Sequence, residues 1–220
     1  PSKVEKYYPL EKKATDKTVI GVPKEYFLKG IDPEITAAVK NAIQQFKKSG
    51  AKIKEVSLLD PKYSIAVYTI VQRAEVSSNL ARFDGIRYEE KRSNFGKEAK
   101  RRIMLGTYAL STGYYDQYYN KAQKVRNLIC KDFERVFKEV DLLISPVSPS
   151  PALKIGASEG QAMFGEMQDV LVEASSLAGL PGISIPCGKT KNNLPLAFQL
   201  FGPQLSEKKL LNTAIKYEQE

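Results

Sequence analysis

The fold class is predicted most directly by residues 18–58, TVIGVPKEYFLKGIDPEITAAVKNAIQQFKKSGAKIKEVSL. The short β-rich run at 18–22 predicts a strand, and Pro23 ends it. A helix should begin at Asp32-Pro33-Glu34, which combines a capping residue, a first-turn proline and a carboxylate near the positive end of the helix dipole. Alternating charged and apolar residues at 52–58 predict a half-buried strand. Strand, helix and strand in succession indicate a βαβ crossover, and therefore an α/β fold with helices packed on a sheet.

The rest of the chain continues this alternation. Helical periodicity predicts helices over residues 63–83, from 97 onward, and over 117–137, 161–177 and 206–218. Short apolar runs predict buried strands at 141–145, 182–186 and 196–201, and we place the second of these in the centre of the sheet. The helix at 117–137 should bury Val125, Leu128, Ile129, Phe133, Val136 and Phe137. Ser206 should cap the last helix, whereas the Lys-rich residues 1–17 should form a connecting segment.

Composition indicates a globular protein without a membrane-spanning segment. Of the 220 residues, 42% are hydrophobic and 27% charged, as in ordinary globular domains. No apolar run reaches the roughly 20 residues that cross a bilayer, so we expect no membrane partner. The first residues, Pro-Ser-Lys-Val-Glu-Lys, lack the apolar core of a signal peptide and an initiator methionine. We therefore expect the chain to begin inside a longer polypeptide or after processing.

The absence of histidine excludes several kinds of site. These residues cannot form a Ser-His-Asp or Cys-His arrangement. Cys130 and Cys187 are far apart in the sequence and should be buried, reduced thiols, so we expect no metal site. The net charge of +9 is compatible with a nucleic-acid partner. Because no aromatic-basic recognition motif accompanies that charge, a solvated basic face is the simpler interpretation.

The run from Ile103 to Leu128 has an unusual concentration of aromatic residues. It holds Tyr114, Tyr115, Tyr118 and Tyr119, whose spacing of one, three and four residues predicts a broad, buried helix face. The order of residues in this run resembles the amidase signature family, and within it the A subunits of glutamyl-tRNA(Gln) amidotransferases. Two more segments resemble the same family, Glu75–Tyr88 and the block from Leu177 to Gly188, LAGLPGISIPCG. The resemblance covers nearly the whole chain, but only the C-terminal part of the family.

This resemblance implies both a fold and an activity. The fold would be α/β, a mixed sheet flanked by helices, with residues 18–220 forming the C-terminal part of an amidase signature domain that lacks its N-terminal part. The implied activity is hydrolysis of glutamine to glutamate and ammonia. Ammonia would then serve to convert Glu-tRNA(Gln) to Gln-tRNA(Gln), with ATP and Mg held in a partner subunit. The implied partners are glutamine, the B and C subunits and, mainly through the partner subunit, tRNA, in the cytoplasm or an organelle.

Three residues match positions at which the family is expected to bind glutamine. The arginine before the Ile-x-Leu-Gly-Thr stretch is Arg102, with Arg101 as the neighbouring alternative, and would hold the α-carboxylate. Asp169, eight residues before Leu177, would receive the α-ammonium. Tyr68, seven residues before Glu75, would contact the substrate. The residues alone also permit a solvated arginine pair, an exposed helix carboxylate and a packed tyrosine.

The sequence contains no candidate for the family's catalytic residues. The family uses a Ser, a cis-Ser and a Lys, with the serines in a Gly/Ser-rich stretch, and these 220 residues contain no such stretch. Ser77 and Ser78 lie on a predicted helix without a suitably spaced lysine. We therefore assign no catalytic residue and expect the chain alone to be inactive, although the full-length protein should be an enzyme. Two alternatives stay open, namely part of a stand-alone amidase acting on small amides and a non-catalytic binding module.

Overall fold

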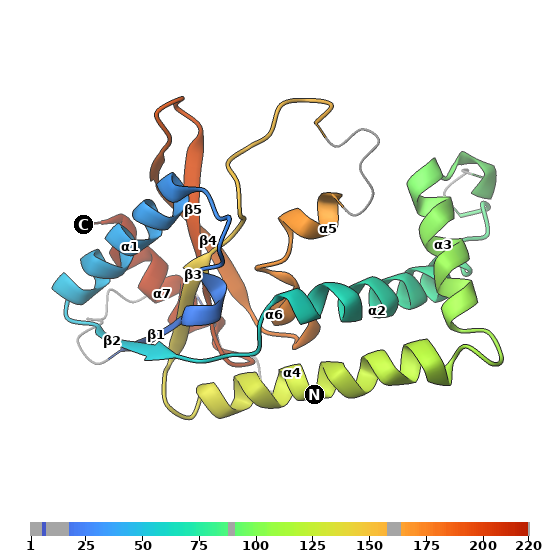
Figure 1. The fold of residues 1–220 in the computed structure, drawn as a ribbon, viewed down its shortest axis with the longest axis horizontal. Coiled ribbons are helices and arrows are strands. Elements are labelled where there is room, and N and C mark those ends of the chain that lie inside the picture. The colour runs from blue at the N-terminus through green and yellow to red at the C-terminus, as the bar shows by residue number, and fades with distance from the viewer. Residues whose placement is uncertain (1–5, 8–17, 88–90, 158–163, 220) are drawn as a thin grey trace.

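A five-stranded sheet and a projecting pair of long helices dominate the computed structural model (Figure 1). The structure describes residues 6–7, 18–87, 91–157 and 164–219. The predicted connecting segment at 1–17 therefore lies almost entirely outside the described residues. None of the described helices has both the length and the apolar composition that a bilayer crossing requires.

The sheet is mixed, as predicted. Strand β1 (Val19–Pro23) pairs in parallel with β2 (Lys52–Val56) and with β3 (Leu142–Pro146). Strand β5 (Pro195–Phe201) runs antiparallel to both β3 and β4 (Gly182–Lys189), which gives the order β2-β1-β3-β5-β4. The prediction that β4 is central was wrong, because it forms an edge of the described sheet and most of its residues are exposed or half-buried.

The βαβ crossover predicted from residues 18–58 is present. A 3-10 turn, η1 (Lys24–Tyr26), follows β1, and helix α1 (Pro33–Lys48) leads to β2. Asp32 Oδ1 accepts a hydrogen bond from the backbone N–H of Glu34 at 2.7 Å, which satisfies one of the free N–H groups at the start of α1. The predicted inner face is buried, with Val39 fully covered and Phe46 packed edge-on against Phe198 of β5.

Aromatic side chains join helices to both faces of the sheet. On one face Phe198 contacts Phe46 of α1 and Tyr217 of α7 (Glu207–Glu218). Phe201, three residues along the same strand and so on the opposite face, contacts Phe133 and Tyr26. The core therefore lies on both sides of β3 and β5, and all five residues of β3 are buried.

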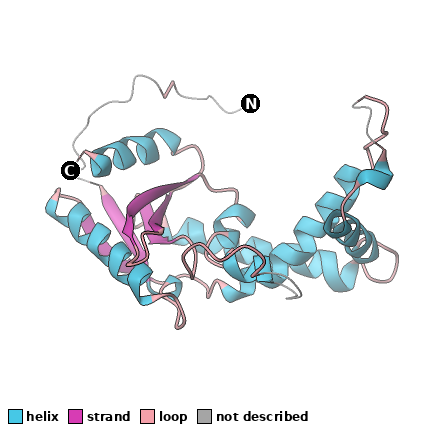
Figure 2. Cartoon of the chain, turned by 90° about the horizontal axis from the view of Figure 1, so that it is seen from above, coloured by secondary structure: helices cyan, strands magenta, loops and turns pink. Residues whose placement is uncertain are grey.

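The long helices form what we call the helical arm, residues 62–136, which extends away from the sheet (Figures 1 and 2). It consists of α2 (Lys62–Leu80), the 3-10 turn η2 (Arg92–Asn94), α3 (Lys97–Ala109), the π-helical turn η3 (Asp116–Asn120) and α4 (Lys121–Val136). At the contact between α2 and α3, a Cβ on Gly106 would lie 1.9 Å from the backbone oxygen of Arg73. Beside it the hydroxyls of Ser77 and Thr107 are 2.7 Å apart. Only glycine permits so close an approach of the two helices.

Two predictions for the arm were wrong. The tyrosine face is not buried, because Tyr114, Tyr115 and Tyr118 are each 38–40% exposed. Their rings stack on other tyrosines, with ring centroids of Tyr108 and Tyr114 4.2 Å apart. Leu128 is 57% exposed, whereas Ile129 is buried as predicted. The arm extends away from the sheet, so its helices have fewer neighbours to cover them and these side chains stay exposed.

The helix predicted over 161–177 is interrupted. Within the described residues the structure has two short helices, α5 (Phe164–Gln168) and α6 (Glu173–Leu177), joined by a turn. The carbonyl oxygen of Leu171 in this turn accepts a hydrogen bond from the side chain of Gln199 at 2.8 Å, and the side chain of Leu171 is fully buried. At this point, contacts with the rest of the fold hold the backbone in a turn, where the periodicity predicted a continuous helix. Ser206 does stand at the start of α7, but its side chain makes no capping hydrogen bond.

Candidate functional site

The three predicted substrate-binding residues lie on three different elements around helix α2. Tyr68 is on α2, Arg102 is on α3, and Asp169 directly follows α5. Helix α2 contacts α3, α5 and α6, so it is the common support of all three positions. In Figure 1, α5 and α3 lie on the same side of α2, one nearer the sheet and the other at the outer end.

Tyr68 is half-buried and packs against the hydrophobic core. A nearby cavity of about 280 Å³ lies between α2 and the start of α4, and it is lined by Ala66, Val67, Ile70, Gln117, Tyr118, Lys121, Ala122 and Val125. Tyr68 lies on α2 beside these lining residues but does not line the cavity itself. Its packing fits a core tyrosine, and its contact with a substrate stays a prediction.

Arg102 is the less exposed member of the arginine pair. Its Nε donates to Oε1 of Glu98 at 2.7 Å, and its side chain is 30% exposed, against 47% for Arg101. Arg101 donates to both oxygens of the same carboxylate, at 2.8 and 3.0 Å. Hydrogen bonds from Arg101 and Arg102 lower the pKa of Glu98 to about 2. Arg102 lies one turn along α3 from Glu98, and its contact with a substrate carboxylate, like the choice of Arg102 over Arg101, stays a prediction.

The contact of Glu98 with the two arginines was not among the sequence predictions, although the spacing of the three residues favours it. Glu98 stands three residues before Arg101 and four before Arg102, the spacings at which opposite charges meet on a helix surface. Its bond to Nε of Arg102 orients the guanidinium along α3. A bond through Nε restrains the orientation of the guanidinium plane relative to the helix.

Asp169 directly follows α5 and has an exposed side chain. Its backbone N–H donates to the carbonyl of Gly165 at 3.2 Å. Its own carbonyl accepts from the N–H groups of Val172 and Glu173, at 2.9 and 3.1 Å. The carboxylate thus stands at the point where the chain leaves α5 and turns toward α6. Its contact with a substrate ammonium stays a prediction.

Neither cysteine forms a disulfide. Both are free and half-buried rather than buried as predicted. Burial raises the pKa of the Cys187 thiol to about 11, which disfavours its thiolate, the nucleophilic form, at pH 7. Among the described residues, no group of three or more cysteine, aspartate or glutamate side chains is arranged to hold a metal ion.

Comparison with known proteins gives consistent results. The amidase family model matches residues 1–211. The chain is 47% identical to the A subunit of glutamyl-tRNA(Gln) amidotransferase from Myxococcus xanthus over 216 residues, and 47% identical to its counterpart from Macrococcus caseolyticus over 215 residues. In both cases 91% of this chain is covered, and the chain spans 44% of the length of the relative.

Solved structures of the same fold were also found. The crystal structure of the glutamyl-tRNA(Gln) amidotransferase A subunit from Thermotoga maritima superposes with a TM-score of 0.74 at 33% identity, covering 96% of this chain and 44% of that one. A 6-aminohexanoate cyclic dimer hydrolase superposes with a TM-score of 0.80 over the full length of this chain and 48% of the other. At 18% identity, the second match concerns the fold alone.

Proposed function

Since the chain belongs to the amidase family, we propose that it forms the glutamine-binding part of a glutaminase subunit in a glutamyl-tRNA(Gln) amidotransferase. The observation that carries this proposal is that Arg102 on α3 and Asp169 directly after α5 stand on two elements that both contact α2. A free amino acid presents a carboxylate and an ammonium on one carbon atom. One guanidinium and one carboxylate are the complementary groups, and a substrate without those two charges would need neither.

The identities support this assignment over a stand-alone amidase. Eight curated relatives with 44–47% identity are named as the A subunit of the amidotransferase. Solved structures named as an amidase, a bacterial aryl acylamidase and a 6-aminohexanoate cyclic dimer hydrolase match this chain at 17–23% identity, which concerns the fold alone. A stand-alone amidase acting on a small or aryl amide would keep the fold without needing the charges of Arg102 and Asp169.

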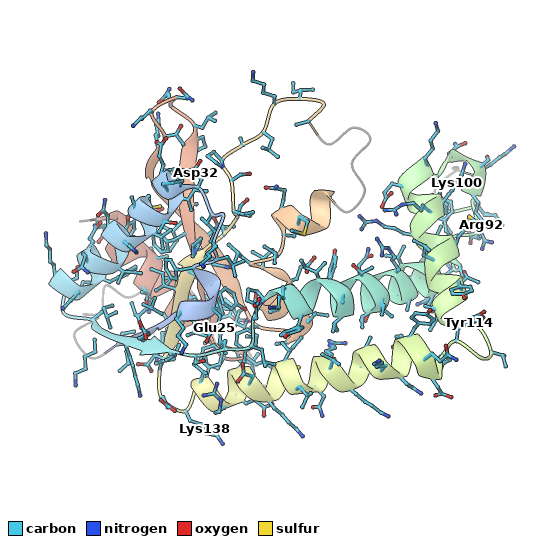
Figure 3. The ribbon with its side chains drawn as sticks, viewed as in Figure 1. Glu25, Asp32, Arg92, Lys100, Tyr114 and Lys138 are labelled. Carbon is cyan, nitrogen blue, oxygen red and sulfur yellow. The ribbon has the colours of Figure 1, made fainter. Side chains whose placement is uncertain are left out.

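In this proposal the full-length protein hydrolyses glutamine, and the ammonia passes to the B and C subunits. There it amidates glutamyl-tRNA with ATP and Mg bound in the partner subunit, which also holds most of the tRNA, in the cytoplasm or an organelle. Two basic side chains at the end of the helical arm, Arg92 and Lys100, fit the assignment of tRNA binding mainly to the partner subunit. Arg92 donates to the carbonyl of Phe83 at 2.7 Å, and Lys100 to that of Ser93 at 2.8 Å (Figure 3). Both side chains therefore use part of their hydrogen-bonding capacity on backbone carbonyls of the arm, which leaves fewer N–H donors for phosphate groups.

The test is steady-state glutamine hydrolysis by the full-length protein in complex with its partners. Arg102→Ala removes a charge-assisted contact and leaves the substrate carboxylate without its partner, so the KM for glutamine should rise at least about tenfold. Asp169→Asn should act in the same way on the ammonium.

Arg101→Ala is the matched control, because Arg101 shares the Glu98 carboxylate but is more exposed. Its KM should change little. The assignment of the pocket is wrong when Arg102→Ala and Asp169→Asn both keep the kinetics of the unchanged enzyme.

A further inference from the structure

Gln199 of β5 is a buried polar residue that links the sheet to the turn carrying Asp169. Its side chain is 6% exposed. Its Nε2 lies 2.9 Å from Oγ of Ser145 and 3.0 Å from the carbonyl oxygen of Pro146, both on the neighbouring strand β3. The third acceptor is the carbonyl oxygen of Leu171, at 2.8 Å. One amide group therefore connects two sheet strands to the turn between α5 and α6.

The turn needs such an external anchor. Within the described residues, helices α5 and α6 span five residues each, far below the roughly 12–15 residues at which an isolated helix becomes marginally stable. Leu171, two residues after Asp169, is fixed both by its fully buried side chain and by its bond from Gln199. Ser150 holds the other side of Asp169, because its hydroxyl donates to Oε1 of Gln168 at 2.8 Å.

We propose that Gln199 is a positioning residue for glutamine recognition. By holding the carbonyl of Leu171 it fixes the backbone of the turn, and thereby the place at which the Asp169 carboxylate meets the α-ammonium of the substrate. This inference rests on the proposed function of Asp169. Gln199 acts indirectly, through the turn, because its buried amide contacts the backbone of Leu171 and not the substrate.

The bond to Leu171 separates this role from simple satisfaction of a buried amide. An NH₂ group has two hydrogens, and β3 alone supplies two acceptors for them, on Ser145 and Pro146. The additional acceptor on Leu171 is the nearest of the three. A glutamine that only filled space in the sheet would not require it.

The test compares two substrates that differ in the group Asp169 is to bind. Glutaramate is glutamine without its α-amino group, and it keeps both the carboxylate and the amide. For each variant of the full-length protein in its complex, kcat/KM is measured by ammonia release with glutamine and with glutaramate. Partial loss of folded enzyme lowers both values by the same factor, so their ratio reports recognition of the ammonium alone.

Gln199→Met keeps the length of the side chain and removes the donor. It should lower the preference for glutamine about tenfold, as expected for loss of a well-placed charged contact, and should lower it no further in an Asp169→Asn background. Gln199→Asn, one methylene shorter, should do the same and replaces Gln199→Met where the latter fails to fold. Ser145→Ala is the matched control, since it removes an acceptor of the same amide but leaves the bond to Leu171, and it should keep the ratio.

The possible results separate the two proposals. When Asp169→Asn lowers the ratio but both Gln199 variants leave it unchanged, the positioning role of Gln199 is refuted. The same holds when the effects of Gln199→Met and Asp169→Asn simply add. When Asp169→Asn itself leaves the ratio unchanged, it is the proposed function of Asp169 that fails.

Discussion

The charge state of Glu98 determines how Arg102 is held. Hydrogen bonds from Arg101 and Arg102 lower its pKa to about 2, below the ordinary glutamate value of about 4.3. A carboxyl group with a lowered folded-state pKa adds stability that is fully present above its unfolded-state pKa. That stability is lost as the pH falls through the folded-state value. Glu98 should therefore remain ionised, and bonded to Arg102, throughout the pH range above about 4.5.

We predict that a ¹³C NMR titration of the Glu98 side-chain carboxyl gives a midpoint well below about 4 in the full-length protein. The midpoint should rise in Arg102→Ala, because one of the two hydrogen-bonding guanidinium groups is then absent. An unshifted midpoint for Glu98 in the unchanged protein would mean that the arginine pair is not held in this way.

At the scale of elements, the arm depends on the close contact of α2 with α3. A Cβ at position 106 would lie 1.9 Å from the Arg73 carbonyl oxygen and 2.5 Å from its carbonyl carbon, both backbone atoms that cannot move aside alone. Gly106→Ala should therefore destabilise the full-length protein by about 1–3 kcal/mol, as overpacking does, and should also weaken glutamine binding by displacing Arg102. Thermal unfolding and KM measure the two effects.

Gly165→Ala is a suitable comparison for that variant. Gly165 lies in helix α5, and a Cβ there would meet no atom within 4 Å. The substitution should be neutral or slightly stabilising, since alanine is the better helix former by about 0.5–1 kcal/mol. Equal melting temperatures for Gly106→Ala and the unchanged protein would contradict the packing described for α2 and α3.

Local chemistry predicted most elements, and tertiary contacts decided the exceptions. The start of α1 followed from Asp32 and Pro33, because capping is a property of neighbouring residues. The break after Asp169 did not, because it depends on a hydrogen bond from Gln199, which is 28 residues beyond Leu171 along the chain. The edge position of β4 was missed for a related reason, since an apolar run indicates burial but not which strand lies beside it.

At the scale of the whole molecule, the candidate site also combines residues that the sequence predicts with contacts that only the fold reveals. Arg102, Asp169 and Tyr68 came from a family resemblance, and the structure supplied what lies around them, Glu98 and Gln199. Glu98 could have been found from its helical spacing to Arg102. No sequence rule connects β5 with the α5–α6 turn, because that contact exists only once the sheet has formed.

The 220-residue chain should by itself release no ammonia from glutamine above background. Amide hydrolysis requires a positioned nucleophile, a base and oxyanion donors together. The chain has no histidine and no Gly/Ser-rich stretch like that of the family. Coupled detection of ammonia, with the full-length protein in its complex as positive control, measures this. Saturable turnover by the chain alone would reveal a catalytic arrangement among these residues.

The central claim is that Arg102 and Asp169 bind the two α-groups of the amino acid. Calorimetric titration with L-glutamate tests it most directly, because the product keeps both groups and is not hydrolysed during the measurement. For the full-length protein in its complex, the Kd should rise at least about tenfold in Arg102→Ala and in Asp169→Asn, whereas Arg101→Ala should bind as the unchanged protein does. Unchanged Kd values for L-glutamate in the Arg102 and Asp169 variants would contradict the account.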